Sequence, residues 1–276
     1  MAQSRVAVVT GASRGIGRAT AIALADAGFD VAVLARTQHE GTAIDDSDSG
    51  QGRALPGSLE STAAEIESRG QRALPLVADL LDRPSLTKAV DQALSELGRI
   101  DVLVNNAVHT GAGSMLRFVD TSIEQFETKV QANYLAPLVL IKAVLPSMLQ
   151  RGGGTIVTVT SHTATNDPPA PVGNGGWGLA YAASKGAVHR VAGILAVELG
   201  DRGITAYNLD PGNVATERMA VNAGDLGLGA YRAAPPTAPA AAIAWLVSNT
   251  GEVPNGSTVK GLRLVLERGL HADWRG

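Results

Sequence analysis

The chain has 276 residues, 23 basic and 26 acidic side chains, a formal net charge of −3 and no cysteine. A weakly acidic chain has no bulk attraction for nucleic acid or anionic lipid, so we expect no nucleic-acid partner. The missing cysteines exclude disulfides, thiolate metal sites and cysteine nucleophiles. An apolar fraction of 45% indicates a folded globular protein, and the 32 glycines are an excess over the usual ~7%.

The first residues carry a short apolar run that ends at Thr10-Gly11, which is too short for a signal peptide. The apolar stretches elsewhere are interrupted before the ~20 residues that cross a bilayer. These features predict a soluble, cytoplasmic protein with no membrane partner.

Short β-branched runs alternate with helical segments along the whole chain. The expected strands are 5–10, 30–34, 72–78, 100–104, 155–160, 204–209 and one within 257–266. The expected helices are 15–27, 58–69, 85–97, 122–150 with two internal prolines, 180–199 and 239–248. Apolar strands that alternate with helices predict βαβ units around a parallel sheet. We therefore expect an α/β fold, a single doubly wound domain over residues 1–276.

Three segments interrupt this alternation. Residues 37–57 hold four acids, one base and four glycines, which predicts an exposed, flexible insertion. Residues 166–178 are rich in proline and glycine around one tryptophan, and residues 215–236 contain scattered glycines. Because the last two flank the motifs described below, we expect them to form loops on the substrate side of a pocket.

A phosphate-binding turn follows the first strand. The segment Gly11-Ala-Ser-Arg-Gly15-Ile-Gly17 joins an expected strand to an expected helix. Such a turn presents free backbone N–H groups and the positive end of the helix to a pyrophosphate. Gly11 permits the tight turn, Gly15 lets phosphates approach the backbone, and Gly17 allows close helix–strand packing.

This turn and five later segments together resemble the short-chain dehydrogenase/reductase family. TGASRGIG has the family's TGxxxGxG spacing, and the remaining motifs occur in the family's order. They are Asp79, Asn105-Asn106-Ala107, Ser161, Tyr181-Ala-Ala-Ser-Lys185 and Pro211-Gly212 with Val214 and Thr216. The resemblance implies a Rossmann-like, seven-stranded parallel sheet, a nicotinamide cofactor and a homotetramer or homodimer.

The candidate catalytic residues are Asn133, Ser161, Tyr181 and Lys185. Tyr181 and Lys185 are spaced i, i+4 and so share one helix face, where an ammonium lowers the pKa of a phenol. By resemblance, Tyr181 protonates the carbonyl oxygen, Lys185 binds the nicotinamide ribose, and Ser161 hydrogen-bonds the carbonyl. Asn133 matches the asparagine that holds a water of the proton relay.

The residues after the second strand indicate the cofactor. That strand ends in Ala35-Arg36 without an acid, and Arg14 lies in the glycine turn, so both arginines can pair with a 2′-phosphate. We expect NADP(H) as the preferred cofactor and NAD(H) as possible, with the acidic insertion weakening the preference. The expected cofactor-binding residues are Gly11, Ser13, Arg14, Gly15, Ile16, Gly17, Arg36, Asp79, Leu80, Asn106, Ala107, Tyr181, Lys185, Pro211, Gly212, Val214 and Thr216.

The chain also departs from the family pattern. The family's NNAG ends in Val108, 20 residues separate Ser161 from Tyr181, and 261–269 replaces the usual terminal Asp-Gly-Gly. The histidines show no metal-ligand spacing, so no metal site is expected. Apolar loop residues at Met115, Trp177, Met219 and Tyr231 are candidates for a substrate pocket.

These features predict an oxidoreductase that transfers a hydride between NADP(H) and a small-molecule carbonyl or alcohol. Two alternatives stay open at this point. One is a non-enzymatic dinucleotide-binding sensor, which typically lacks the tyrosine or lysine. The other is an NAD-dependent dehydrogenase, epimerase or dehydratase on the same fold.

Overall fold

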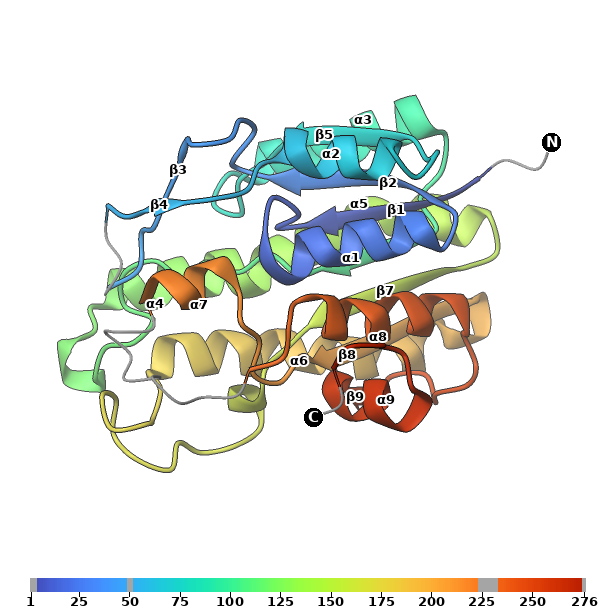
Figure 1. The fold of residues 1–276 in the computed structure, drawn as a ribbon. Helices are drawn as coiled ribbons and strands as arrows, with labels where there is room; N and C mark the ends of the chain where they lie inside the picture. The colour runs from blue at the N-terminus through green and yellow to red at the C-terminus, as the bar shows by residue number, and fades with distance from the viewer. Residues whose placement is uncertain (1–3, 49–51, 223–232, 275–276) are drawn as a thin grey trace.

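The computed structural model describes residues 4–48, 52–222 and 233–274. Within these residues a seven-stranded parallel sheet has the order β5-β2-β1-β6-β7-β8-β9 (Figure 1). Its strands are β1 (Arg5–Thr10), β2 (Phe29–Ala35), β5 (Ala73–Val77), β6 (Val102–Asn105), β7 (Gly154–Val159), β8 (Ile204–Asp210) and β9 (Thr258–Lys260). The expected Rossmann-like sheet is therefore confirmed.

Helices cover both faces of the sheet. One face carries α1 (Gly15–Asp26), α2 (Leu59–Glu67), α8 (Thr237–Ser248) and α9 (Gly261–Arg268). The other carries α3 (Arg83–Leu97), α5 (Ala136–Gln150) and α6 (Leu179–Leu199). Alternate residues of β1 belong to the two cores, since Ala7 and Val9 pack on the first face and Val6 and Val8 on the second. Because β1 is buried on both faces of the sheet, its sequence is a continuous apolar run.

The strand order reverses at β1, which lies between β2 and β6. The chain passes from β1 to β2 on one side of this point, and from β6 to β7 on the other. A crevice therefore opens at the carboxyl ends of β1 and β6. The glycine turn that follows Thr10 and the residues that follow Asn105 meet at this crevice.

The long helix expected at 122–150 is interrupted. It consists of α4 (Ile123–Val130), a π-helical turn at Gln131–Leu135 and α5. Pro137 lies just after the π turn, and a proline lacks the N–H of a regular helix. The stretch Ile123–Gln150 has the length and mean hydropathy, 1.5, of a membrane-crossing helix. Leu140, Ile141 and Val144 are nevertheless buried in the core, so its apolar face covers the sheet.

The insertion at 37–57 is only partly as expected. It contains a two-stranded antiparallel sheet of β3 (Ala43–Ile44) and β4 (Ala54–Leu55). Ala43, Asp45 and Leu55 are buried, so the expectation of an exposed insertion is wrong for these residues. Their burial comes from packing against distant segments, which the local composition does not reveal.

The last expected strand is also shorter than the segment proposed for it. β9 ends at Lys260, and the next eight residues form α9. Leu264 and Val265 of this helix are buried in the core beside α8, which accounts for its apolar residues.

Candidate active site

The turn after β1 can be built only with glycine at its three key positions. Gly11 and Gly15 have φ of +67° and +56°, in the left-handed region that favours glycine. A Cβ on Gly11 would lie 2.9 Å from the Cα of Ala107, and a Cβ on Gly17 would collide with the Gly11 carbonyl. The turn therefore leaves its backbone open at the amino end of α1.

Thr10 joins this turn to the end of β6. Its hydroxyl accepts hydrogen bonds from the backbone N–H groups of Asn106 and Ala107, each at 3.0 Å. The side-chain amide of Asn106 donates to the Thr10 carbonyl at 2.8 Å. The two strand ends that carry the expected cofactor residues are thus held side by side.

A carboxylate of the chain itself lies at the glycine turn. Glu217, the first residue of α7 (Glu217–Asn222), accepts a hydrogen bond from the backbone N–H of Gly15 at 2.9 Å. This contact shows that the turn binds an anionic oxygen through its backbone, as a pyrophosphate requires. The glycine turn therefore fits a dinucleotide.

The other expected cofactor residues surround the same crevice. Ser13 and Val214 are buried, Ile16 packs on the core, and Leu80 is partly buried. Three further contacts fix the local backbone. They are Leu81 N–H to Asp79 Oδ1 at 2.9 Å, Gly212 N–H to Asp210 Oδ1 at 3.1 Å, and Thr216 N–H to the Val214 carbonyl at 2.9 Å. Pro211 precedes Gly212 after the end of β8.

Both arginines expected at the 2′-phosphate are engaged by the insertion. Arg14 donates to the backbone carbonyls of Pro56 and Gly57 at 2.8 and 2.9 Å. Arg36 pairs with the carboxylate of Asp46 at 3.1 Å. The insertion thus reaches back to the cations that the sequence assigns to the cofactor.

Tyr181 and Lys185 lie one turn apart on α6, and the Tyr181 side chain lies near Ser161. Burial raises the pKa of Tyr181, while its side-chain hydrogen bond with Ser161 opposes that rise. The expectation that Lys185 lowers the pKa of Tyr181 is wrong for this state, because desolvation dominates. Lys185 is itself buried and donates to the Val159 carbonyl at 2.8 Å. Burial lowers its pKa to about 8.

Asn133 lies in the π-helical turn between α4 and α5. Its Oδ1 accepts from the backbone N–H of His109 at 2.8 Å, and its Nδ2 donates to Ser184 Oγ at 3.1 Å. Ser184 in turn donates to the Tyr181 carbonyl at 2.8 Å. Asn133 therefore links the loop after β6 to the helix that carries the tyrosine, and π turns often occur at functional sites.

Lys129 is a residue near this site that the sequence reading missed. It is fully buried, donates to the Gly111 carbonyl at 2.5 Å, and has a pKa lowered by burial to about 8. Asp48 and Asp46 of the insertion oppose that shift. The signal in the sequence is the i, i+4 spacing from Asn133, which places both on one helix face.

Arg218 of α7 is a second missed residue. It pairs with Asp45 at 3.3 Å and Asp46 at 3.1 Å, and it also donates to the hydroxyl of Thr110. No local pattern indicates these pairs, because their partners are more than 100 residues apart in the chain.

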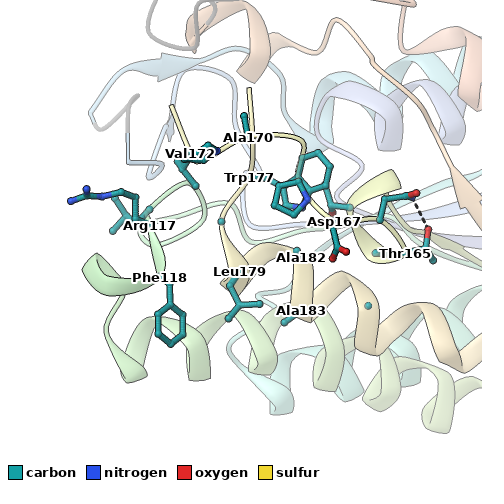
Figure 2. Close-up of a pocket in the computed structure, with 18 of the residues that line it drawn as sticks. Arg117, Phe118, Thr165, Asp167, Ala170, Val172, Trp177, Leu179, Ala182 and Ala183 are labelled. Carbon is teal, nitrogen blue, oxygen red and sulfur yellow. Dashed lines mark hydrogen bonds between the residues drawn. The ribbon is translucent and has the colours of Figure 1, made fainter. Parts of the chain in front are cut away.

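The segment 166–178 lines a cavity of about 710 Å³ (Figure 2). Trp177 and Asp167 lie on its loop side, and Ala182 and Ala183 lie on its α6 side. The cavity therefore lies between this loop and the face of α6 that carries Ala182 and Ala183. That the loop covers the substrate pocket stays a prediction.

The other candidate pocket residues are spread out. Trp177 lies edge-on to the ring of His162, at 5.9 Å between centroids. Met115 and Met219 are each 38% exposed and neither lines the 710 Å³ cavity. Tyr231 lies outside the described residues.

The comparisons with known proteins agree with this fold. A family model described as short chain dehydrogenase matches residues 5–51 and 53–225. A short chain dehydrogenase of Pseudocercospora fijiensis is 34% identical over 215 residues, which are 78% of this chain and 61% of that protein. A cyclohexanol dehydrogenase of Rhodococcus sp. is 34% identical over 220 residues, covering 79% of this chain and 77% of that one.

A solved structure shows the same arrangement. The short chain dehydrogenase from Mycobacterium paratuberculosis bound to NAD is 26% identical, with a TM-score of 0.76. The match covers 94% of this chain and 96% of that one. The chain therefore belongs to the short-chain dehydrogenase/reductase family of oxidoreductases.

Proposed function

We propose that this protein transfers a hydride between a nicotinamide dinucleotide and a small-molecule carbonyl or alcohol. The observation that carries the proposal is that the Ser161 hydroxyl lies close enough to the Tyr181 phenol to oppose the rise of its pKa. A phenol and a serine hydroxyl that meet at one point can both address a single substrate oxygen. When bound, the dinucleotide supplies or accepts the hydride.

Each polar side chain of the site has a proposed role. Tyr181 gives a proton to the substrate oxygen during reduction and takes it back during oxidation. Ser161 donates a hydrogen bond to the same oxygen and stabilises the charge that develops there. Lys185, one turn along α6 from Tyr181, binds the ribose of the nicotinamide. Asn133 positions the loop at His109 against α6 and supports proton transfer to Tyr181.

The variant Tyr181→Phe tests this proposal. We expect turnover of ketones and alcohols to fall by at least about 100-fold, because the general acid is lost, while dinucleotide affinity stays within about twofold. Tyr207→Phe is the matched control, since it removes a tyrosine hydroxyl that lies outside the candidate site and donates to the Val253 carbonyl. Near-normal turnover in Tyr181→Phe would refute the mechanism.

The finer proposal is that NADP(H) is preferred and NAD(H) is also accepted, and that the acidic insertion weakens the preference. Arg14 and Arg36 lie at the glycine turn and at the tip of β2, where the ribose of a bound adenosine lies in such folds. The relative from M. paratuberculosis was solved with NAD, which supports binding of the unphosphorylated cofactor. Values of kcat/KM for NADPH and NADH, measured with one ketone, test the preference.

We also propose that the protein assembles as a homodimer or homotetramer. Ile194 and Val197 lie one turn apart on α6 and are 53% and 86% exposed. Exposed apolar side chains on one face of a long helix are typical of a surface that packs against another subunit.

A further inference from the structure

The carboxylate of Asp46 lies between two arginines that come from distant parts of the chain. Its Oδ2 pairs with Nη2 of Arg36 at 3.1 Å, and its Oδ1 pairs with Nη1 of Arg218 at 3.1 Å. Burial alone would raise the pKa of Asp46, but the hydrogen bonds and charges of the two arginines lower it overall. Asp46 is therefore ionised at neutral pH.

Arg36 occupies the position that decides between the two nicotinamide dinucleotides. It follows the last residue of β2, directly beside the end of β1 where the glycine turn begins. A free guanidinium at this position attracts a 2′-phosphate, whereas a carboxylate there hydrogen-bonds a ribose hydroxyl. In this chain the guanidinium belongs to the residue just after the strand, and the carboxylate reaches it from the insertion, ten residues later.

We propose that Asp46 is a specificity-determining residue that opposes binding of a 2′-phosphorylated dinucleotide. The proposal rests on the proposed function only in that the chain binds nicotinamide dinucleotides. A 2′-phosphate near Arg36 meets the negative charge of Asp46, and the two anions compete for one guanidinium. A ribose hydroxyl carries no charge and meets no such repulsion.

The insertion also engages Arg14, the second cation expected at the phosphate. Three donors of Arg14 bond the Pro56 carbonyl, the Gly57 carbonyl and the Thr37 hydroxyl. These contacts fix Arg14 without adding negative charge, whereas Asp46 neutralises Arg36. A substitution at Asp46 alone therefore tests how its negative charge affects cofactor binding, because the contacts between the insertion and Arg14 stay in place.

Other acids near the insertion have different partners. Asp48 accepts hydrogen bonds from the backbone N–H groups of Gly113 and Met115, at 2.8 and 3.1 Å. Glu60 of α2 pairs with His39 at 2.7 Å. Glu60→Gln thus removes one nearby negative charge without touching Arg36, which makes it the matched control.

The test is a binding measurement without substrate. Affinities of NADP⁺ and NAD⁺ are measured by isothermal titration calorimetry for the wild-type protein, Asp46→Asn and Glu60→Gln. We expect Asp46→Asn to raise the ratio of NADP⁺ to NAD⁺ affinity by about tenfold, since a charge-assisted bond to phosphate replaces the ion pair. Glu60→Gln is expected to leave the ratio within about twofold.

An unchanged ratio of the two affinities in Asp46→Asn would overturn the proposal. If both affinities change by the same factor, Asp46 only holds Arg218 and α7 in place. Asp46→Ser serves as a second variant, and a failure of both variants to fold would also overturn the proposal. A shifted ratio in a protein that turns over no carbonyl or alcohol would support this proposal and refute the proposed function.

Discussion

The carboxylate of Glu217 accepts a hydrogen bond from the backbone N–H of Gly15 at 2.9 Å, although 202 residues separate the two. The N–H belongs to the turn that fits a pyrophosphate, so a bound dinucleotide and Glu217 compete for the same donor. Two anions at one helix end repel each other, even though either alone is stabilised there.

Glu217→Gln should therefore bind dinucleotides more tightly. Glutamine keeps an oxygen that can accept from Gly15 but loses the charge, so we expect the Kd for NAD⁺ to fall about threefold to tenfold. Without cofactor, the free energy of unfolding should fall by about 0.5 kcal/mol, because the helix end loses its anion. Calorimetric titration and urea denaturation measure the two effects. Glu267→Gln, which breaks an ion pair on α9, is the control, and a weaker affinity in Glu217→Gln would contradict the competition.

Gly17→Ala should abolish dinucleotide binding. The added methyl group collides with the Gly11 carbonyl, so the glycine turn cannot keep its shape. Gly193→Ala is a matched helical control, because a Cβ at Gly193 meets nothing within 4 Å. The control should keep its affinity and gain up to about 1 kcal/mol of stability from higher helix propensity. Fluorescence titration with NADH compares the two variants, and normal binding by Gly17→Ala would exclude the turn as the phosphate site.

The stability of the protein should rise between pH 8 and pH 10. Lys185 and Lys129 are buried and each has a pKa of about 8, below the ordinary value of 10.5. In this range the unfolded lysines hold their protons while the folded ones have lost them, so alkali favours the folded state. Each lysine contributes on the order of 2 kcal/mol to the rise.

Urea denaturation at pH 7.5 and pH 10 measures this change in the free energy of unfolding. Lys129→Met should remove about half of it, since the variant has one buried ammonium fewer. A rise of the same size in Lys129→Met and the wild-type protein would show that Lys129 is not desolvated in solution.

Val197→Arg should break the proposed assembly. A charge placed at a side chain that is 86% exposed costs the isolated fold little, but it prevents the same surface from being buried between subunits. Light scattering coupled to size-exclusion chromatography should show a smaller species than the wild-type protein. Leu266→Arg on α9, where the side chain is 47% exposed, is the control. An unchanged mass for Val197→Arg would place any subunit contact elsewhere.

The sequence alone determined the sheet, the glycine turn and the shared helix face of Tyr181 and Lys185. These features depend on periods of two or 3.6 residues and on left-handed positions such as Gly11, all of which are local properties of the backbone. The tertiary structure decided the charge environment of the site. Asp46 reaches Arg36, Glu217 reaches Gly15, and burial raises the pKa of Tyr181, because charge pairing and desolvation depend on which distant segments pack together.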